Sequence, residues 1–269
     1  MSITFIGGGN MAAALIGGLI AQGRGASEIN VVELQEDARQ RLTAKFGVHC
    51  EPAIASRLGA VIVIAVKPQQ MRAVASAIGP LLKRELVITI AAGIRLEDLS
   101  RWLGGYDQLV RCMPNTPALI GEGISGLYAN AAVGAAQRDL AESILGAIGT
   151  TLWVADEDML DPVTAISGSG PAYVFYFIEA LQQAAKDMGF SDTDARKLAV
   201  ATFVGAAQLA AHSADDLSIL RERVTSKGGT TERALASMEA DKVKELIVRA
   251  LHAAHQRARE LGAQLGKDG

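Results

Sequence analysis

The sequence predicts an α/β domain with a doubly wound parallel sheet, followed by an all-helical domain. Three observations support this fold class. Val/Ile-rich segments alternate with helical patterns early in the chain, a glycine-rich junction (Gly7 to Gly9) joins the first such segment to a helix, and the pattern after about Asp161 is helical. Strand, helix and strand with short connections are typical of βαβ units. We therefore expect domains at 1–161 and 162–269.

The expected strands of the first domain are mostly continuous in hydrophobicity, which is typical of strands buried on both faces of a parallel sheet. They lie at 2–7, 29–34, 60–66, 86–91 and 108–113. Helical patterns between them lie at 10–23, 36–46, 69–82 and 95–103. A helix at 134–148 and a strand at 150–155 are expected to close the domain.

The second domain contains no convincing strand pattern. Its expected helices lie at 171–188, 192–212, 215–223, 230–239 and 241–265. The last helix carries apolar residues at helical spacing from Val243 to Leu265 on an otherwise charged surface. This stripe is either a face packed on the core or a subunit interface, because long helices in a small domain have few internal partners.

Composition excludes several classes of function. The chain has 269 residues, 49% hydrophobic and 20% charged, with a net charge of −3 and no basic stripe, so we expect no nucleic-acid partner. The longest apolar run, Gly59 to Val66, is shorter than the roughly 20 residues of a membrane span, and we see no signal peptide. Cys50 and Cys112 form neither a disulfide framework nor a metal-ligand pattern, which favours a reducing, cytoplasmic location and no metal.

The glycine-rich junction fits a dinucleotide-binding fingerprint. Gly7-x-Gly9-x-x-Ala12 follows a strand, begins a helix and heads a βαβ unit, which is the context of the G-x-G-x-x-G/A pattern in Rossmann domains. The first glycine makes the tight turn, the second admits a pyrophosphate, and the free N–H groups of the helix N-terminus bind it. The alternative is a tight turn that binds nothing.

Glu33, 21 residues after Ala12 at the end of the second strand, bears on the choice of cofactor. An acidic residue there accepts hydrogen bonds from the ribose 2′-OH of NAD and repels the 2′-phosphate of NADP. This favours NADH, although a solvated strand-end Glu is the alternative. Arg39 and Arg41 on the next helix could still reach a phosphate.

Small and polar residues follow three further strands, where an open parallel sheet binds its ligands. Lys67 and Pro68 follow one strand, Gly93 another, and Asn115 lies between two prolines after a third. We expect a nicotinamide near these loops. Lys67 could be a general acid, but contact with cofactor ribose or phosphate is favoured.

Two clusters of hydroxyl groups and glycines precede helices in the second domain. The stretch TAISGSGPAY includes Ser169, and VTSKGGTTERAL begins at Val224. Hydroxyls and bare N–H groups at a helix N-terminus can hold an anion, although helix capping by Ser and Thr is the alternative for each cluster. Two such clusters in one small domain favour a pocket for a carboxylate.

The catalytic groups of other enzyme classes are missing. None of the four histidines (His49, His212, His252 and His255) lies in a motif, and G-x-S-x-G, H-E-x-x-H and P-loop patterns are absent. The chemistry therefore needs hydride donation with little side-chain acid catalysis. An imine substrate fits, because its nitrogen can enter already protonated.

Taken together, these motifs resemble those of pyrroline-5-carboxylate reductase, the last enzyme of proline synthesis. FIGGGNMAAALIGGL, AVKPQ, RCMPNTPA, ISGSGPAYVF and VTSKGGTTERAL occur in order along nearly the whole chain. The resemblance implies reduction of 1-pyrroline-5-carboxylate to L-proline with NADPH or NADH. It also implies a helical dimerisation domain that forms a homodimer, from which larger rings of dimers can assemble, with the active site between subunits.

The resemblance also implies a role for particular residues. Thr231 matches the hydroxyl that hydrogen-bonds the ring nitrogen, and Thr164 matches a pocket residue near the reacting carbon. The expected substrate-binding residues are Ser226, Gly228, Gly229, Thr230 and Ser169. The expected cofactor-binding residues are Gly7, Gly8, Gly9, Asn10, Met11, Glu33, Ala65, Val66, Lys67, Pro68, Ala92, Gly93 and Asn115. Many family members carry Asn or Ser with Arg where this chain has Glu33-Leu34, which puts a preference for NADPH in doubt.

Two other functions remain as alternatives. A β-hydroxyacid-type dehydrogenase shares the architecture but needs a catalytic Lys with an Asn one turn on, and neither Lys186 nor Lys197 has one nearby. A non-catalytic dinucleotide-binding protein is the other alternative, and the intact hydroxyl cluster argues against it. The sequence leaves open the cofactor preference, the oligomer size, feedback by proline and activity on related cyclic imines.

Overall fold

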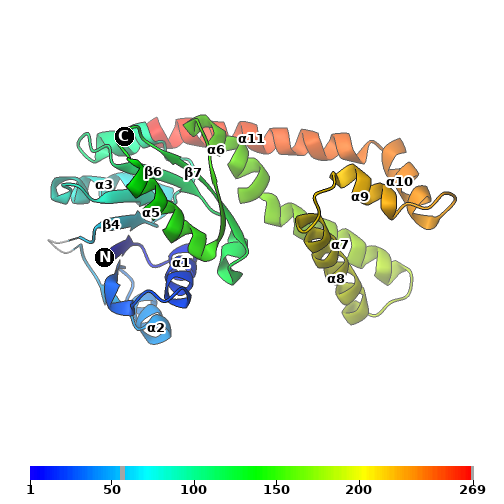
Figure 1. Cartoon of the computed structure of the whole chain (residues 1–269), viewed down its shortest axis with the longest axis horizontal. Helices are drawn as coiled ribbons and strands as arrows, with labels where there is room; N and C mark the ends of the chain where they lie inside the picture. The colour runs from blue at the N-terminus through cyan, green and yellow to red at the C-terminus, as the bar shows by residue number, and fades with distance from the viewer. Residues whose placement is uncertain (55–57, 268–269) are drawn as a thin grey trace. The chain divides into compact units, whose positions relative to one another are not determined.

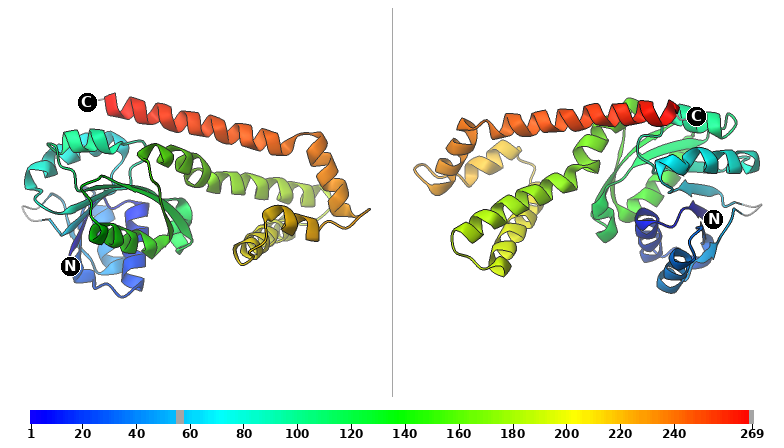
Figure 2. Two further views of the ribbon diagram at one scale, coloured as in Figure 1. Left: turned by 45° about the horizontal axis from the view of Figure 1, so that its top comes forward. Right: turned by 180° about the vertical axis from the view of Figure 1, so that it is seen from behind.

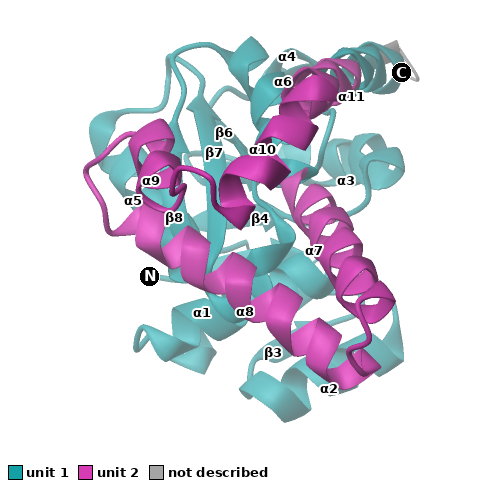
Figure 3. Ribbon diagram, turned by 90° about the vertical axis from the view of Figure 1, so that its right-hand side faces the viewer, with its two compact units in different colours: residues 1–169, 254–269 teal, residues 170–253 magenta. Residues whose placement is uncertain are grey.

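A computed structural model describes residues 1–54 and 58–267 and divides the chain into two compact units. Unit 1 comprises Met1–Ser169 with Ala254–Gly269, and unit 2 comprises Gly170–Ala253 (Figure 3). These units differ from the expected ranges 1–161 and 162–269 in two places. Residues 162–169 pack with the first unit, and so does the end of the last helix.

Unit 1 is built on one eight-stranded sheet of order β3-β2-β1-β4-β5-β6-β7-β8. The strands are β1 (Ile3–Ile6), β2 (Ile29–Val32), β3 (His49–Glu51), β4 (Val61–Ile64), β5 (Leu86–Thr89), β6 (Leu109–Met113), β7 (Gly123–Ala129) and β8 (Gly149–Trp153). Every neighbouring pair is parallel except β6 and β7. The predicted α/β class is confirmed.

Helices cover both faces of this sheet, as Figures 1 and 2 show. The helices α1 (Asn10–Ala21), α2 (Glu36–Phe46) and α5 (Ala135–Leu145) contribute to one core cluster. The helices α3 (Met71–Ile78) and α4 (Leu96–Trp102) contribute to the other. Strand residues alternate between the two clusters because successive side chains point to opposite faces. For example, Val63 packs in the first cluster and Ile62 and Ile64 pack in the second.

The sequence analysis did not predict two of the strands, β3 and β7. The edge strand β3 has only three residues, HCE, and none is buried. β7, with the sequence GISGLYA, contains two glycines and a serine, which are poor strand formers. β7 runs antiparallel to β6, so the predicted parallel sheet contains one antiparallel pair among the described strands. Its pairing with β6 on one side and β8 on the other outweighs its weak intrinsic propensity.

The segment before Gly170 is helical, which the sequence analysis did not predict. A 3₁₀ turn at Glu157–Met159 leads into the short helix α6 (Leu160–Val163) and then a π-helical turn at Thr164–Gly168. The turn is closed by a hydrogen bond from the Ser169 N–H to the Thr164 carbonyl, 2.9 Å long. Widened turns of this kind are frequent at functional sites.

The described residues of unit 2 are helical without strands, as predicted. Its helices are α7 (Gly170–Asp187), α8 (Asp192–Ala211), α9 (Leu217–Arg223), α10 (Thr230–Ala240) and the first part of α11 (Val243–Lys267). Lys242, with φ of 53°, separates α10 from α11. Ser191 caps α8 by accepting a 3.1 Å hydrogen bond from the Asp194 N–H.

The end of α11 packs on unit 1. Leu265 lies against the core cluster that includes α3 and α4. Arg101 of α4 also donates a 3.2 Å hydrogen bond to the Gly266 carbonyl. Within the described ranges, no helix combines the length and the apolar character needed to cross a membrane.

Candidate functional site

The sheet of unit 1 has a topological switch point between β1 and β4. From β1 the chain proceeds outward to β2 and β3, and it then returns to β4 and proceeds in the opposite direction to β5 and β6. The helices that follow β1 and β4 therefore leave the sheet on opposite faces. A crevice opens at such a point beyond the carboxyl ends of the strands, where ligands bind in open α/β sheets. The Gly7 turn follows β1, and Ala65 to Pro68 follow β4.

Gly7 is required where the glycine turn passes the end of β4. Its φ is +98°, a conformation that residues with a side chain rarely adopt. A Cβ atom at this position would also lie 2.7 Å from the Ala65 carbonyl oxygen and 3.1 Å from Cγ1 of Val66. Thus the structure brings together Gly7, Ala65 and Val66, which the sequence analysis assigned to one cofactor site.

The N-terminus of α1 is open toward an anion. Gly9 is the N-cap, and no side chain caps the first-turn N–H groups of Asn10 to Ala12. The first turn also contains no acidic residue, which would compete with a phosphate. These N–H groups and the positive end of the helix dipole are suited to a pyrophosphate.

Glu33 lies beside the glycine turn, as its predicted role requires. Its Oε2 accepts a 2.8 Å hydrogen bond from the Gly8 N–H, and its Oε1 accepts one of 2.8 Å from the Gln35 N–H. Nη1 of Arg39 donates to the carbonyl oxygens of Glu33 (2.8 Å) and Leu34 (2.7 Å). Arg39 is therefore bound to the end of β2, where a carboxylate rather than a cation lies beside the glycine turn.

The loops after β4 and β5 carry the next predicted residues. Lys67 is exposed and is the N-cap of a 3₁₀ turn that begins at Pro68. Ala92 is exposed and Gly93 is half-buried in the loop after β5. This loop is covered by the end of α11, because a Cβ on Gly93 would meet Cδ1 of Leu265 at 2.8 Å.

Asn115 is buried and its side chain bridges two elements. Its Nδ2 donates to the Ser167 carbonyl at 3.1 Å, and its Oδ1 accepts from the Ile124 N–H at 2.9 Å. The amide therefore joins the π-helical turn to β7. Contact between Asn115 and the cofactor stays a prediction.

The π-helical turn carries two further hydroxyl groups bound to the backbone. Thr164 donates to the Leu160 carbonyl at 2.7 Å, and Ser167 donates to the Val163 carbonyl at 2.9 Å. Thr164 is half-buried, and its hydroxyl oxygen can still accept a hydrogen bond. Its place near a reacting carbon stays a prediction.

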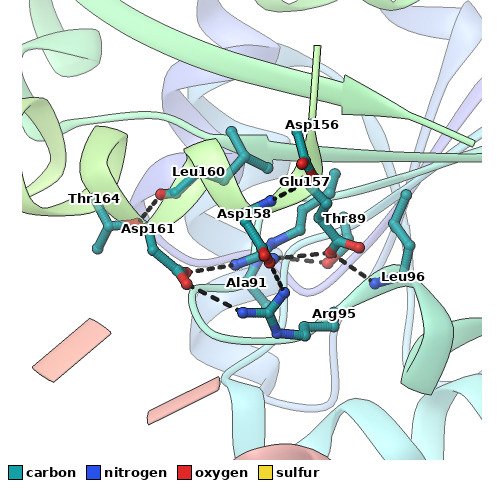
Figure 4. Close-up of polar contacts among 11 residues, drawn as sticks. Thr89, Ala91, Arg95, Leu96, Asp156, Glu157, Asp158, Leu160, Asp161 and Thr164 are labelled. Carbon is teal, nitrogen blue, oxygen red and sulfur yellow. Dashed lines mark hydrogen bonds and ion pairs between the residues drawn. The ribbon is translucent and has the colours of Figure 1, made fainter. Parts of the chain in front are cut away.

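A cluster of ion pairs next to this turn was missed by the sequence analysis (Figure 4). Arg111 in β6 and Asp161 in α6 are both 3% exposed. Arg111 bonds Glu157 at 2.8 Å and lies 3.8 Å from Asp161, and Arg95 contacts Asp158 and Asp161. The hydrogen bond and charge of Arg95 lower the pKa of Asp158. An arginine inside an apolar strand, in LVRCM, was the available sequence signal, because a buried charge needs a partner.

In unit 2 the predicted substrate residues form the turn that precedes α10. Gly229 is the N-cap of the helix, and no side chain caps the first-turn N–H groups, which include those of Thr230 and Thr231. Glu232 accepts a 2.7 Å hydrogen bond from the Gly228 N–H, and the Gly229 N–H donates to the Ser226 carbonyl at 3.0 Å. Thr231 is half-buried, and Ser226 is exposed. The turn therefore offers hydroxyl and N–H groups to an anion.

The two hydroxyl clusters fall in different units. Ser169 ends unit 1, whereas Ser226 to Thr231 belong to unit 2. The one carboxylate pocket expected from both clusters stays a prediction.

The residues around the glycine turn are suited to binding a dinucleotide. The turn at Gly7 has no room for a side chain, α1 begins without a capping side chain, and Glu33 lies beside both. Among the described residues, no group of three or more His, Cys, Asp or Glu side chains is arranged to hold a metal ion.

Comparisons with known proteins agree with a dinucleotide-binding domain at the start of the chain. The sequence profile described as "NADP oxidoreductase coenzyme F420-dependent" matches residues 2–93, and the one described as "Pyrroline-5-carboxylate reductase dimerisation" matches residues 157–261. The chain is 47% identical to a pyrroline-5-carboxylate reductase of Pseudomonas aeruginosa over 268 residues, which cover 98% of each chain.

Two solved structures are similar to the whole chain. A pyrroline-5-carboxylate reductase from Coxiella burnetii superposes with a TM-score of 0.91 at 41% identity, over 97% of this chain and 98% of that one. A pyrroline carboxylate reductase from Plasmodium falciparum, solved with NADP bound, superposes with a TM-score of 0.85 at 28% identity and the same coverage. On the strength of the full-length identity to curated relatives, the chain belongs to the pyrroline-5-carboxylate reductase family.

Proposed function

We propose that this protein reduces 1-pyrroline-5-carboxylate to L-proline with NADPH or NADH, the last step of proline biosynthesis. The observation that carries the proposal is the 47% identity to a pyrroline-5-carboxylate reductase over 98% of both chains. The glycine turn at the switch point of the sheet supports the dinucleotide half of the reaction.

Unit 1 binds the cofactor in this proposal. Gly7 to Met11 hold the pyrophosphate, Glu33 accepts from the adenosine ribose, and residues Ala65 to Pro68, Ala92, Gly93 and Asn115 line the site toward the nicotinamide. The bound dinucleotide supplies a hydride to the carbon of the C=N bond.

The turn before α10 binds and orients the substrate. The turn formed by Ser226, Gly228, Gly229 and Thr230 binds the carboxylate, and the hydroxyls of Ser226 and Thr230 and the uncapped first-turn N–H groups of α10 are the donors. The Thr231 hydroxyl hydrogen-bonds the ring nitrogen, which carries the proton that becomes the amine N–H of proline. As the hydride forms the new C–H bond, the C=N π electrons become the nitrogen lone pair. The binding groups therefore accelerate hydride transfer more by orienting the substrate than by acid catalysis.

The protein acts as a homodimer in this proposal, and dimers can associate further. The match of residues 157–261 to the dimerisation profile of the family supports it. We also propose a reducing, cytoplasmic location, which the free thiols of Cys50 and Cys112 support.

The test is oxidation of NADH and NADPH, followed in parallel at 340 nm with purified protein and 1-pyrroline-5-carboxylate. Cofactor oxidation that depends on the imine and yields proline is the expected result. Tight binding of the dinucleotides without imine reduction would instead identify a non-catalytic dinucleotide-binding protein. Turnover of 3-hydroxy acids alone would indicate a β-hydroxyacid-type dehydrogenase.

A further inference from the structure

The ion-pair cluster of unit 1 joins three segments that are distant in sequence. Arg95 and Leu96 follow the Gly93 loop, Arg111 lies in β6, and residues 157–161 lead into the π-helical turn at Thr164 (Figure 4). Two of these segments carry residues of the proposed site. The cluster therefore lies between the loop expected near the nicotinamide and the turn expected near the substrate.

The hydrogen bonds and ion pairs that join the three segments are made mainly by Glu157 and Arg111. One oxygen of Glu157, Oε1, accepts from the Leu96 N–H at 2.8 Å and from Nη1 of Arg111 at 2.8 Å. Nη2 of Arg111 approaches Oδ1 of Asp161 at 3.8 Å, and Nη2 of Arg95 approaches Oδ2 of the same carboxylate at 3.1 Å. Each carboxylate thus contacts groups from two segments.

Burial restricts the charged side chains of this cluster to few positions. The side chains of Arg111 and Asp161 are 4% exposed and that of Glu157 is 16% exposed. A buried charge that loses its partner is strongly destabilised, so these groups have few alternative positions. Asp161 also lies inside the turn that is closed by the hydrogen bond from the Thr164 hydroxyl to the Leu160 carbonyl.

We propose that Arg111, with Glu157, is a positioning residue for hydride transfer, holding the Gly93 loop and the Thr164 turn at a fixed separation. Arg111 does not touch substrate or cofactor in this role. It acts through Glu157, which accepts from the Leu96 N–H, on one side and through Asp161 on the other. This inference rests on the proposed reductase function.

The decisive variant is Glu157→Gln, with Arg111→Lys as a second. Gln keeps the size and an oxygen acceptor for the Leu96 N–H but removes the charge that faces Arg111. Lys keeps the charge but cannot form the two-sided contacts of a guanidinium group. The matched control is Arg24→Lys, which changes an arginine of unit 1 paired with Glu28 at 3.9 Å, outside the cluster.

The first readout is hydrogen–deuterium exchange without substrate. Glu157→Gln should increase exchange in both 91–96 and 160–168, leave the glycine turn at 7–11 unchanged, and leave NADH affinity within about threefold of wild type. Increased exchange in only one of the two segments, or in neither, overturns the proposal. This readout does not depend on activity, so it separates failure of the positioning role from failure of the reductase function.

The second readout is the kinetic isotope effect with NADH deuterated at C4. Because small displacements of reacting groups can cost about 100-fold in rate, kcat should fall about 10- to 100-fold with KM little changed. The isotope effect on kcat should rise, because hydride transfer becomes the slow step. The kcat and isotope effect of Arg111→Lys should lie between those of Glu157→Gln and wild type, and those of Arg24→Lys should match wild type. A fall in kcat that only follows the folded fraction, with an unchanged isotope effect, contradicts the proposal.

Discussion

At the residue scale, the proposed chemistry depends most on the hydroxyl of Thr231. This half-buried side chain lies in the first turn of α10, beside N–H groups suited to a carboxylate. Thr231→Ala should lower kcat by roughly 10²–10⁴-fold if the hydroxyl supplies or holds the proton of the ring nitrogen. Steady-state kinetics with saturating cofactor measure this. Ser237→Ala, which removes an exposed hydroxyl of the same helix outside the proposed site, is the control. An unchanged kcat in Thr231→Ala would remove the Thr231 hydroxyl from the mechanism.

The choice of cofactor is also decided by one residue. The Glu33 carboxylate accepts from the Gly8 N–H, and Arg39 donates to the carbonyls of Glu33 and Leu34. In the proposed site this carboxylate repels a 2′-phosphate. We expect a higher kcat/KM for NADH than for NADPH. Glu33→Ser should raise the NADPH to NADH ratio of kcat/KM by at least about 10-fold, because like charges in contact cost several kcal/mol and about 1.4 kcal/mol is already tenfold.

The control for this substitution is Glu36→Gln in the first turn of α2, which removes the same charge from an exposed position. It should leave the ratio nearly unchanged. An equal change of the NADPH to NADH ratio in both variants would mean that the net charge of the protein, rather than the position of Glu33, determines the cofactor preference.

The two cysteines should differ in reactivity. Complete burial raises the pKa of the Cys112 thiol to about 12, so almost none is present as the reactive thiolate near neutral pH. Cys50 is only half-buried. Reaction with an aromatic disulfide reagent at pH 8 should therefore titrate one fast thiol per native chain and two after denaturation. Loss of the fast phase in Cys50→Ser would identify it, and rapid reaction of both thiols would contradict the burial of Cys112.

At the element scale, the Gly93 loop depends on the end of α11. Gly93 has φ of +78°, and an added Cβ would meet Leu265 at 2.8 Å. Gly93→Ala should lower the free energy of unfolding by about 1–2 kcal/mol from the left-handed backbone alone, with a further steric cost. Denaturant unfolding followed by circular dichroism measures this.

A double variant separates these two costs. In a Leu265→Ala background, Gly93→Ala should lose only the free energy that comes from the left-handed backbone, because the steric clash with Leu265 is removed. Gly146→Ala is the matched control, because its φ is −63° and no atom lies within 4 Å of the added Cβ. Equal destabilisation by Gly93→Ala and Gly146→Ala would contradict this account.

The elements also show where sequence patterns suffice. β1, β4 and β5 are four-residue apolar runs buried on both faces, so hydrophobicity alone predicted them. β7 and the π-helical turn were not predictable in this way. The Gly126 backbone in β7 fits under Val163 and Leu160 of α6, and such a close contact between distant segments leaves no local pattern.

At the scale of the whole molecule, unit 2 leaves many large apolar side chains exposed. Those on α7 and α8 include Val174, Phe175, Tyr176, Leu181, Leu198, Val204 and Leu209. Large apolar side chains exposed on two helices that pack together are typical of an interface. Val204→Glu with Leu209→Glu should shift the protein from dimer to monomer, because each places a charge where a second copy packs in the proposed dimer.

Sedimentation velocity at several concentrations measures this shift. Leu34→Glu is the control, because Leu34 is 74% exposed in unit 1, and it should leave the oligomeric state unchanged. A wild-type protein that sediments as a monomer would overturn the dimer proposal.

The sequence by itself determined the fold class, the place of the glycine turn and the family motifs, because these depend on local patterns of hydrophobicity, glycine and hydroxyl groups. Only the tertiary structure decided which groups meet across the sheet. It placed Glu33 on the Gly8 N–H, bound both ends of the Asn115 amide, and surrounded Arg111 with carboxylates. Those contacts join residues from separate strands and loops, so their geometry follows from sheet order and packing rather than from spacing along the chain.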